Sequence, residues 1–279
     1  MDGFHSLWSA PYIKGKNANE YFMQDYELLT MILSALMWRK HNGGIYLCAD
    51  EPAIEFIEKN NLSHIWNLGI KEISVPETIN EKVFWAAGKI YSLKEMKMPA
   101  VMIDLDLIIW KKITNIIKKT DILAIHREGI FPDIYPDKEF FNMKKEYKFD
   151  EEWDWNILPV NTCMLYLADE DFKNYYAESS AKFMESCTET EENLCHMVFA
   201  EQRLLAMCAA KKRKTISSFF PGSTDIENQD IFTHLWGYKN ILKFNYMERV
   251  AYNKKTYDRI IAEFPEEKEV LDNLNIIRL

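Results

Sequence analysis

The stretch MPAVMIDLDLIIW, residues 98–110, decides the fold class that we expect for this chain. It opens on a short apolar run, which is typical of a fully buried strand of a parallel sheet. Two carboxylates follow, Asp104 and Asp106, and burying them without partners would be costly. Because side chains alternate along a strand, these two point to one side and predict a seat for a divalent cation that could hold a diphosphate. The alternative is a strand that runs out into solvent with its acids hydrated.

Composition sets the class of protein. The chain has 279 residues, of which 48% are hydrophobic and 14% aromatic, so one large domain or two small ones can bury a sizeable core. Its net charge of -9 argues against a general nucleic-acid binder, which normally carries a basic face. We therefore expect no nucleic-acid partner.

The five cysteines are scattered and include no CxxC pair, which fits a reducing compartment. The first residues show no basic region followed by a long apolar stretch, as a signal peptide would. The chain has no run of about 20 apolar residues, so no transmembrane segment is expected. Together these features predict a cytoplasmic location.

Strand-like and helix-like segments alternate along the chain, which predicts an α/β sheet with parallel strands. Residues 127–158 interrupt the alternation with an aromatic and acidic stretch, which we interpret as a long excursion or lid. The expected strands are residues 4–8, 45–49, 71–75, 99–106, 122–126, 161–167 and 215–220. The expected helices are residues 17–40, 81–96, 169–184 and 191–210, with further helical pieces in 249–279.

Ligands of open α/β sheets bind beyond the carboxyl ends of the strands. That rule places Trp8, Asp50, Asp104, Asp106 and His126 on one rim. Asp50 is also expected to cap the helix that follows it.

Glu201 falls inside the apolar stripe of its helix, with Leu194, Val198, Leu205 and Cys208. A carboxylate on a buried face is paired, ligating, or directed into a cavity. The functional interpretation makes Glu201 a catalytic carboxylate, with Gln202 beside it as a further hydrogen-bonding group. The structural alternative is a salt bridge inside the fold, to a group such as Lys89.

His234 is a candidate third metal ligand beside Asp104 and Asp106, and a mixed oxygen and nitrogen set favours Mn²⁺ over Mg²⁺ or Ca²⁺. The alternative is a histidine packed among aromatic residues. Trp8 could stack on a nucleobase or simply fill the core, and Lys89 could reach a phosphate or stay solvated. Neither GxGxxG nor GxxxxGK[ST] occurs, so no glycine-rich phosphate loop is expected.

Taken in order, these residues resemble a GT-A type glycosyltransferase, a nucleotide-diphospho-sugar transferase fold with a DxD motif. The residues that carry the resemblance are the strand ending in Asp104-Leu105-Asp106, the segment Asn161-Thr162-Cys163-Met164, the helix with Glu201-Gln202, and His234-Leu235-Trp236. The resemblance implies a GT-A like, Rossmann-type mixed sheet flanked by helices. It assigns residues 1–240 to the catalytic domain and residues 241–279 to a C-terminal helical extension packed on it.

The resemblance also implies roles. Sugar would move from a nucleotide-diphosphate donor to a glycan or other hydroxyl acceptor, with Mn²⁺ (or Mg²⁺) as cofactor and retention at the sugar carbon. The metal ligands would be Asp104, Asp106 and His234, and the donor would contact Trp8, Asp104 and Lys89. The catalytic residues would be Glu201, Asn161 and Gln202.

Two other functions compete with this one. A phosphatase of the haloacid dehalogenase type also places DxD after an apolar strand, but Ile108 stands where that motif has Thr or Val. A non-catalytic module that binds glycans or nucleotide sugars would keep the fold without the reaction.

Overall fold

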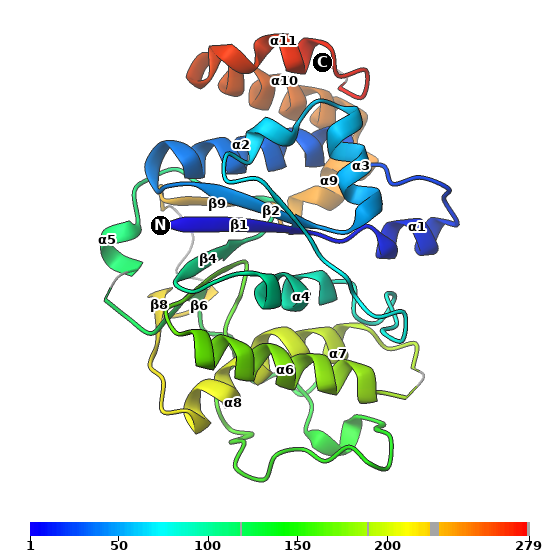
Figure 1. Ribbon diagram of the computed structural model, residues 1–279, viewed down its shortest axis with the longest axis vertical. Helices are drawn as coiled ribbons and strands as arrows, with labels where there is room; N and C mark the ends of the chain where they lie inside the picture. Colours follow the sequence, from blue (N-terminus) through cyan, green and yellow to red (C-terminus); the bar gives the residue numbers. More distant parts are fainter. Residues whose placement is uncertain (118, 189, 224–228, 278–279) are drawn as a thin grey trace.

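A mixed seven-stranded sheet runs through the molecule, and helices cover both of its faces (Figure 1). This computed structural model describes residues 1–117, 119–188, 190–223 and 229–277. The strand order is β3-β2-β1-β4-β7-β6-β8, in which β7 is antiparallel to both neighbours and the other pairs are parallel. The strands are β1 (Asp2–Leu7), β2 (Ile45–Ala49), β3 (Ile70–Glu72), β4 (Ala100–Ile103), β6 (Ile122–His126), β7 (Met164–Leu167) and β8 (Ile216–Phe220).

A second, two-stranded antiparallel sheet is formed by β5 (Leu107–Ile109) and β9 (Phe232–His234). Because β5 follows β4 after only three residues, this small sheet lies at the carboxyl end of β4. It therefore brings a segment from late in the chain to the rim of the main sheet.

Helix α2 packs beside the sheet on one side with α10 outside it, while α4, α6 and α8 pack together on the other (Figure 1). Three short 3₁₀ helices and one π-helical segment complete the described elements. The α-helices are α1 (Ala10–Lys16), α2 (Asp25–His41), α3 (Glu51–Lys59), α4 (Ala87–Glu95), α5 (Thr114–Ile117), α6 (Glu170–Ser186), α7 (Leu194–Val198), α8 (Leu204–Lys211), α9 (Tyr238–Phe244), α10 (Tyr246–Glu263) and α11 (Lys268–Asp272). The others are η1 (Ser63–Ile65), η2 (Lys138–Phe140), the π-helical η3 (Phe199–Arg203) and η5 (Pro265–Glu267).

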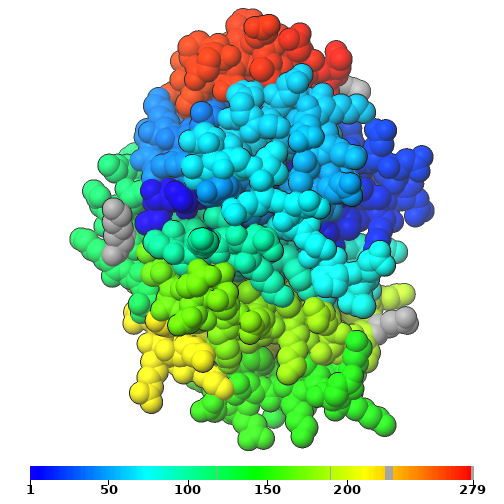
Figure 2. Space-filling view, in the orientation of Figure 1, coloured from blue at the N-terminus to red at the C-terminus, as the bar shows by residue number. Residues whose placement is uncertain are grey.

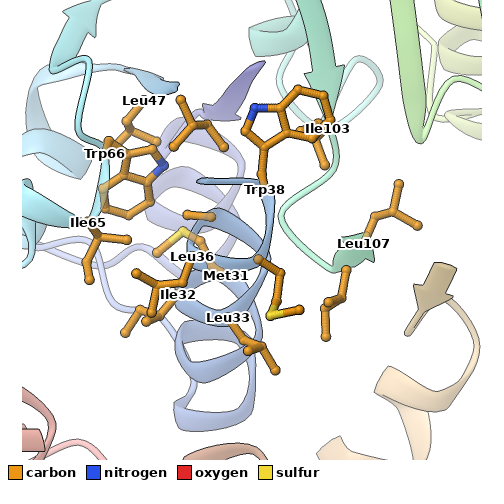
Figure 3. Close-up of a cluster of buried hydrophobic side chains, with 14 of the residues drawn as sticks. Met31, Ile32, Leu33, Leu36, Trp38, Leu47, Ile65, Trp66, Ile103 and Leu107 are labelled. Carbon is orange, nitrogen blue, oxygen red and sulfur yellow. The ribbon is translucent and has the colours of Figure 1, made fainter. Parts of the chain in front are cut away.

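Side-chain alternation along the central strands fills a core on each face of the sheet. In β4, Val101 and Ile103 join the cluster around α2, whereas Ala100 and Met102 join the cluster around α4 and α6. Figure 3 shows Trp38, Leu47 and Ile103 in the first cluster. Each fully buried aliphatic side chain contributes about 1.5–3 kcal/mol, so strands that are apolar on both faces are fixed in the middle of the sheet.

The mixed sheet flanked by helices confirms the fold class, but the sheet is not wholly parallel, because β7 runs against its neighbours. The predicted strands at 45–49 and 122–126 match β2 and β6, and the other predicted strands and helices have shifted ends. The predicted strand at 99–106 is too long, since β4 ends at Ile103 and the two aspartates lie in the turn before β5. The predicted helix at 191–210 is interrupted by the π-helical η3.

The helix predicted at residues 17–40 begins too early, and a short helix precedes it where a loop is expected. Residues Ala10–Lys16 form α1, and Asn17 ends it in the left-handed conformation with φ 48°. Helix α2 begins only at Asp25, where the Glu27 carboxylate accepts a hydrogen bond from the Gln24 N–H. Helix α2 is also not amphipathic: from Asp25 to Trp38 it is buried on all sides, between the sheet and α10.

The aromatic stretch 127–158 connects β6 to β7 and holds only the short helix η2 among the regular elements. Several of its aromatic side chains pack inward, with Phe141 and Trp155 each in ring contact with Phe199. Arg203 is buried beneath it and donates hydrogen bonds of 2.7 Å to the backbone oxygens of Tyr135 and Pro136. The excursion is therefore anchored to the π-helical segment.

Helix α9 crosses residue 240, where the expected boundary between catalytic domain and extension lies, and α10 packs along α2. The C-terminal residues therefore lie on the N-terminal part of the chain at one end of the molecule (Figure 2). The boundary stays a prediction. Among the described residues, no helix is both long enough and apolar enough to span a bilayer. All five cysteines are free thiols, and the cellular location stays a prediction.

Candidate metal and ligand site

The two aspartates lie in a tight turn at the carboxyl end of β4. The Asp104 N–H donates to the Cys163 carbonyl at 2.8 Å, and the Leu107 N–H donates to the Asp104 carbonyl at 3.0 Å. Alternation along a strand is expected to bring the two aspartates together. They lie together instead because they share a turn held between β4, β5 and the segment before β7. Both carboxylates are largely buried, with 18% and 13% of their side chains exposed.

Asp104, Asp106 and His234 form a possible metal site. One ligand atom from each lies within 4.8 Å of the other two. The register of the small sheet causes this, because Leu107 pairs with His234 and the Leu235 N–H donates to the Asp106 carbonyl at 3.1 Å. Two carboxylate oxygens and one imidazole nitrogen suit a hard or borderline divalent cation such as Mn²⁺.

A lysine and a histidine lie against Asp106. Lys239 Nζ on α9 lies 2.7 Å from its Oδ2, and His234 Nε2 lies 3.4 Å from the same atom. Burial alone would raise the pKa of Asp106, but the contacts with His234 and Lys239 outweigh it, so its pKa lies below the ordinary value. Asp106 is therefore a carboxylate at neutral pH, which is the state that a metal ligand needs.

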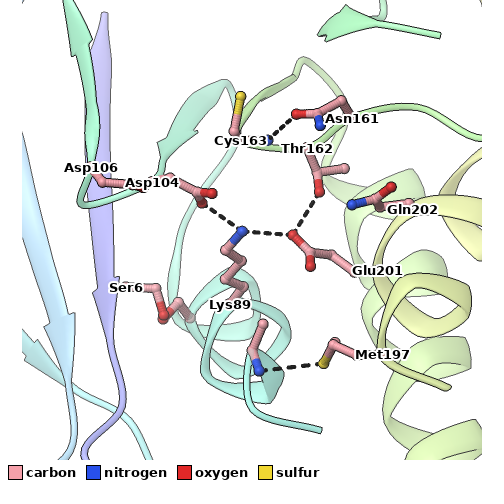
Figure 4. A network of polar contacts seen from close by, with 12 residues as sticks. Ser6, Lys89, Asp104, Asp106, Asn161, Thr162, Cys163, Met197, Glu201 and Gln202 are labelled. Carbon is pink, nitrogen blue, oxygen red and sulfur yellow. Dashed lines mark hydrogen bonds and ion pairs between the residues drawn. The ribbon is translucent and has the colours of Figure 1, made fainter. Parts of the chain in front are cut away.

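Lys89 on α4 bridges the aspartate turn and the π-helical segment. Its Nζ lies 2.5 Å from Asp104 Oδ1 and 2.7 Å from Glu201 Oε1 (Figure 4). Burial disfavours the charge on Lys89, but the two carboxylates outweigh it and raise the pKa of Lys89 above the ordinary value. The ion pair that the sequence leaves as the structural alternative for Glu201 is therefore present, and Lys89 is not solvated.

Glu201 is fixed in place by its neighbours. Only 5% of the residue is exposed, and its Oε1 also accepts a hydrogen bond of 2.6 Å from the Thr162 hydroxyl (Figure 4). The wide π-helical turn is stabilised from α6, where Ser180 and Tyr176 donate hydroxyl hydrogen bonds of 2.6 Å to the carbonyls of Ala200 and Glu201. Such π segments occur frequently at functional sites.

Asn161 and Gln202 lie on the same side of the molecule as Glu201. The Asn161 side chain donates to Glu128 at 3.2 Å and accepts from the Cys163 N–H at 3.1 Å. The Gln202 carbonyl oxygen accepts from the Tyr135 hydroxyl at 2.6 Å. The excursion 127–158 therefore orients both side chains, through Glu128 for Asn161 and through Tyr135 for Gln202.

One open cleft of about 470 Å³ collects most of these groups. Every predicted site residue lies on its wall: Trp8, Lys89, Asp104, Asp106, Asn161, Glu201, Gln202 and His234. Two further members of the predicted rim are absent from that wall. His126 lines an adjacent pocket with Asn161 and His234, and the Asp50 carboxylate contacts Ser9.

Asp50 also does not cap helix α3 with its side chain. Its carboxylate accepts instead from the N–H and hydroxyl of Ser9, at 2.9 Å and 2.6 Å, and so fixes the chain just after Trp8. Asp50 does occupy the predicted N-cap position, but its carboxylate is engaged by these two donors at the end of the neighbouring strand β1, which sequence spacing cannot show.

An aromatic pocket of about 270 Å³ adjoins the cleft and shares Trp8, Tyr21 and Asp106 with it. Tyr12 and Tyr21 meet edge to face in its wall, with ring centroids 5.4 Å apart. Trp8 fits there because Gly88 faces it, since a Cβ on Gly88 would lie 2.5 Å from the Trp8 Cβ. The cleft therefore places Asp104, Asp106 and His234 beside a pocket lined by aromatic side chains.

Three contacting residues were missed at the sequence level: Lys239, Thr162 and Tyr135. Lys239 stands five residues after His234, so the strand pairing that delivers the histidine also delivers the lysine. Nothing in the local sequence marks Thr162 or Tyr135 as a partner of the Glu201-Gln202 pair.

A family model matches residues 1–267, that is, almost the whole chain. The chain belongs to the DUF6734 family. This family is described as one of unknown function. Searching curated protein sequences gives no match for this DUF6734 member.

Solved structures similar to this DUF6734 chain include glycosyltransferases. Mouse xyloside xylosyltransferase 1 shares 11% identity over 78% of this chain and 84% of its own, with a TM-score of 0.39. The glycosyltransferase GlyE of Streptococcus pneumoniae TIGR4 shares 12% identity over 72% of this chain, with a TM-score of 0.35, and the match spans only 44% of GlyE. HddC of Yersinia pseudotuberculosis shares 11% identity over 88% and 99% of the two chains, with a TM-score of 0.42. Similarity at this level does not define the reaction, which has to be argued from the site.

Proposed function

We propose that this protein transfers a sugar from a nucleotide-diphosphate donor to a hydroxyl acceptor, with the help of a divalent cation. The single observation that carries the proposal is the convergence of Asp104, Asp106 and His234 at the end of a buried strand, on the wall of a cleft that continues into an aromatic pocket. That arrangement suits a ligand with a polyanionic centre and a flat aromatic end.

The donor would lie along the cleft. Asp104, Asp106 and His234 would hold the cation, which supplies charge stabilisation to the diphosphate as it leaves the sugar. Trp8 and the neighbouring aromatic residues would stack on the base. Lys89 and Lys239 would sit at either side of the diphosphate, since each already contacts one of the two aspartates.

The sugar would face Glu201, Asn161 and Gln202. Glu201 Oε1 is engaged by both Lys89 and Thr162, which supports a positioning role for this carboxylate over the role of a base that takes a proton from the acceptor. Asn161 and Gln202 would donate amide hydrogen bonds to sugar hydroxyls. This arrangement supports transfer with retention, which the family resemblance also implies.

A thermal-shift series on the full chain tests the proposal. UDP or GDP together with Mn²⁺ should raise the melting temperature more than the sum of either addition alone, because a ligand that binds the native state stabilises it. Mg²⁺ in place of Mn²⁺ identifies the preferred cation. Release of phosphate from an aryl phosphate, with no nucleotide effect, would instead identify a phosphatase. Stabilisation by a glycan alone would identify a binding module.

A further inference from the structure

Large hydrophobic side chains are exposed on one corner of the molecule, between residues 236 and 247. Trp236 is 80% exposed, Phe244 78% and Met247 74%. We call this surface the α9 patch. It consists of Trp236, Tyr238, Ile241, Phe244, Tyr246 and Met247.

The α9 patch sits on well-packed elements. The inner side of α9 is anchored by Leu242, which is fully buried with Tyr26 and Leu235. The turn into α10 is fixed by Asn245, whose side chain accepts a hydrogen bond from the Glu248 N–H. The exposed side chains are therefore held outward by a folded corner, and in a monomer they would remain in water at a cost.

Positive charge lies within the α9 patch. Residues 236–259 hold six lysines and arginines, of which four pair with carboxylates: Lys239 with Asp106, Arg249 with Asp25, Lys254 with Asp258 and Arg259 with Glu263. Lys243 is exposed within the patch, with its Nζ 5.3 Å from the centre of the Phe244 ring. Lys243 therefore supplies the positive charge of the patch itself, in a chain whose net charge is -9.

We propose that the α9 patch docks on an anionic lipid bilayer. Protruding Trp, Tyr, Phe and Ile side chains beside lysines suit the interface between headgroups and acyl chains, and the basic residues complement anionic headgroups. A stable contact with a second protein chain uses about 20 to 30 residues a side, which is more than the short corner from Trp236 to Met247 supplies.

Docking would also orient the cleft. Trp236 and Lys239 lie both in this segment and on the cleft wall, so a bilayer bound at the α9 patch would lie beside the cleft mouth. The proposal does not rest on the proposed sugar transfer, because vesicle binding needs neither nucleotide nor metal.

Vesicle flotation of the full chain tests the docking. Vesicles of phosphatidylcholine with phosphatidylglycerol should carry the protein upward, and binding should fall with added salt, whereas phosphatidylcholine alone should carry at least about tenfold less. Phe244→Glu with Met247→Glu should lower binding by at least about tenfold, and Lys243→Glu by about fivefold or more. Phe131→Glu, at a side chain 59% exposed outside the patch, is the matched control and should bind as the unchanged protein does.

Circular dichroism and thermal melting of each variant verify that it is folded. The proposal is overturned if the unchanged protein stays at the bottom of the gradient with anionic vesicles. It is equally overturned if the Phe244 and Met247 variant floats as well as the Phe131 control. Sedimentation that finds a dimer dissociated by Phe244→Glu would assign the patch to a second copy of the chain.

Discussion

Lys89 Nζ lies 2.7 Å from Glu201 Oε1, across 112 residues of sequence, and the same nitrogen lies 2.5 Å from Asp104. A mostly buried lysine therefore links the turn that holds the two aspartates to the π-helical segment. Lys89→Met should lower the free energy of unfolding by about 3 kcal/mol, because it leaves two carboxylates without their buried partner. Denaturant unfolding measures this.

A double-mutant cycle of Lys89→Met with Glu201→Gln should then show a coupling of about 1–3 kcal/mol. The matched control is the exposed pair of Lys211 with Glu152, 2.7 Å apart, where Glu152 has 74% of its side chain exposed. The same cycle there should give a much smaller coupling, because solvent screens an exposed pair. Equal coupling at the two pairs would contradict the structural importance of the Lys89 bridge.

Asp106→Ala should abolish the joint stabilisation by Mn²⁺ and nucleotide, and lower turnover by roughly 10²–10³-fold, because it removes a direct metal ligand. Asp230→Ala removes a carboxylate that is 77% exposed and pairs with Lys111, and it should leave both quantities unchanged. Isothermal calorimetry with Mn²⁺ and UDP or GDP measures the binding. Full nucleotide affinity in Asp106→Ala would count against the metal assignment.

Glu201→Gln should reduce turnover by about 10²-fold while donor affinity changes only a few-fold, because the carboxylate faces the sugar and not the diphosphate in the proposed arrangement. Steady-state rates and donor binding are measured on the same preparation. A parallel loss of both, together with a lowered melting temperature, would assign Glu201 to the structural ion pair alone.

The site shows what a sequence can and cannot predict. The order of Asp104, Asp106 and His234 suggests a shared metal site, and the strand β4 that positions the first two is evident from its apolar run. The turn that aligns the aspartates is invisible, because it depends on a hydrogen bond to Cys163. The π-helical turn at Glu201 is invisible for the same reason, since hydroxyls of α6 stabilise it.

His5 makes the stability of the fold depend on pH. It is fully buried, and burial lowers its pKa to about 3. The negative charge of Asp106 acts in the opposite direction but is the smaller effect. Trp66 donates to its Nδ1 at 3.3 Å, so its Nε2 carries the proton and contacts Ser34 Oγ at 3.1 Å. Ser34 in turn donates to the carbonyl of Leu107, directly after the turn that holds Asp104 and Asp106.

The neutral ring is needed for this chain of hydrogen bonds, so the unfolded chain binds a proton at His5 that the native protein does not. Between pH 6.5 and about 3 stability should therefore fall as the pH falls. From pH 7 to pH 4.5 the His5 contribution to that loss is about 2–3 kcal/mol. Urea unfolding at both pH values should show a loss smaller by this amount in His5→Phe. An unchanged loss would mean that His5 is protonated in the folded protein.

Arg203 connects the site to the 127–158 excursion, and it is 1% exposed. Its guanidinium donates to the backbone oxygens of Tyr135, Pro136 and Trp155, and its carbon lies 5.1 Å from the centre of the Trp155 ring. Arg203→Lys keeps the positive charge but removes the planar guanidinium group with its several N–H donors. Some of the backbone carbonyls that it now contacts would therefore lose their donor. We expect the free energy of unfolding to fall by about 2–3 kcal/mol.

Arg203→Lys should also allow the excursion 127–158 to unfold locally while the rest of the fold stays intact. Hydrogen exchange in residues 131–158 should then speed up at least tenfold, while the exchange of β1 and β4 amides follows global stability. Lys182→Arg, on the exposed side of α6, is the control substitution. It should change neither the exchange in residues 131–158 nor the exchange of the β1 and β4 amides. Because Tyr135 also holds Gln202, we expect turnover to fall with the loss of local order. Faster exchange with unchanged turnover would show that the excursion does not position the site.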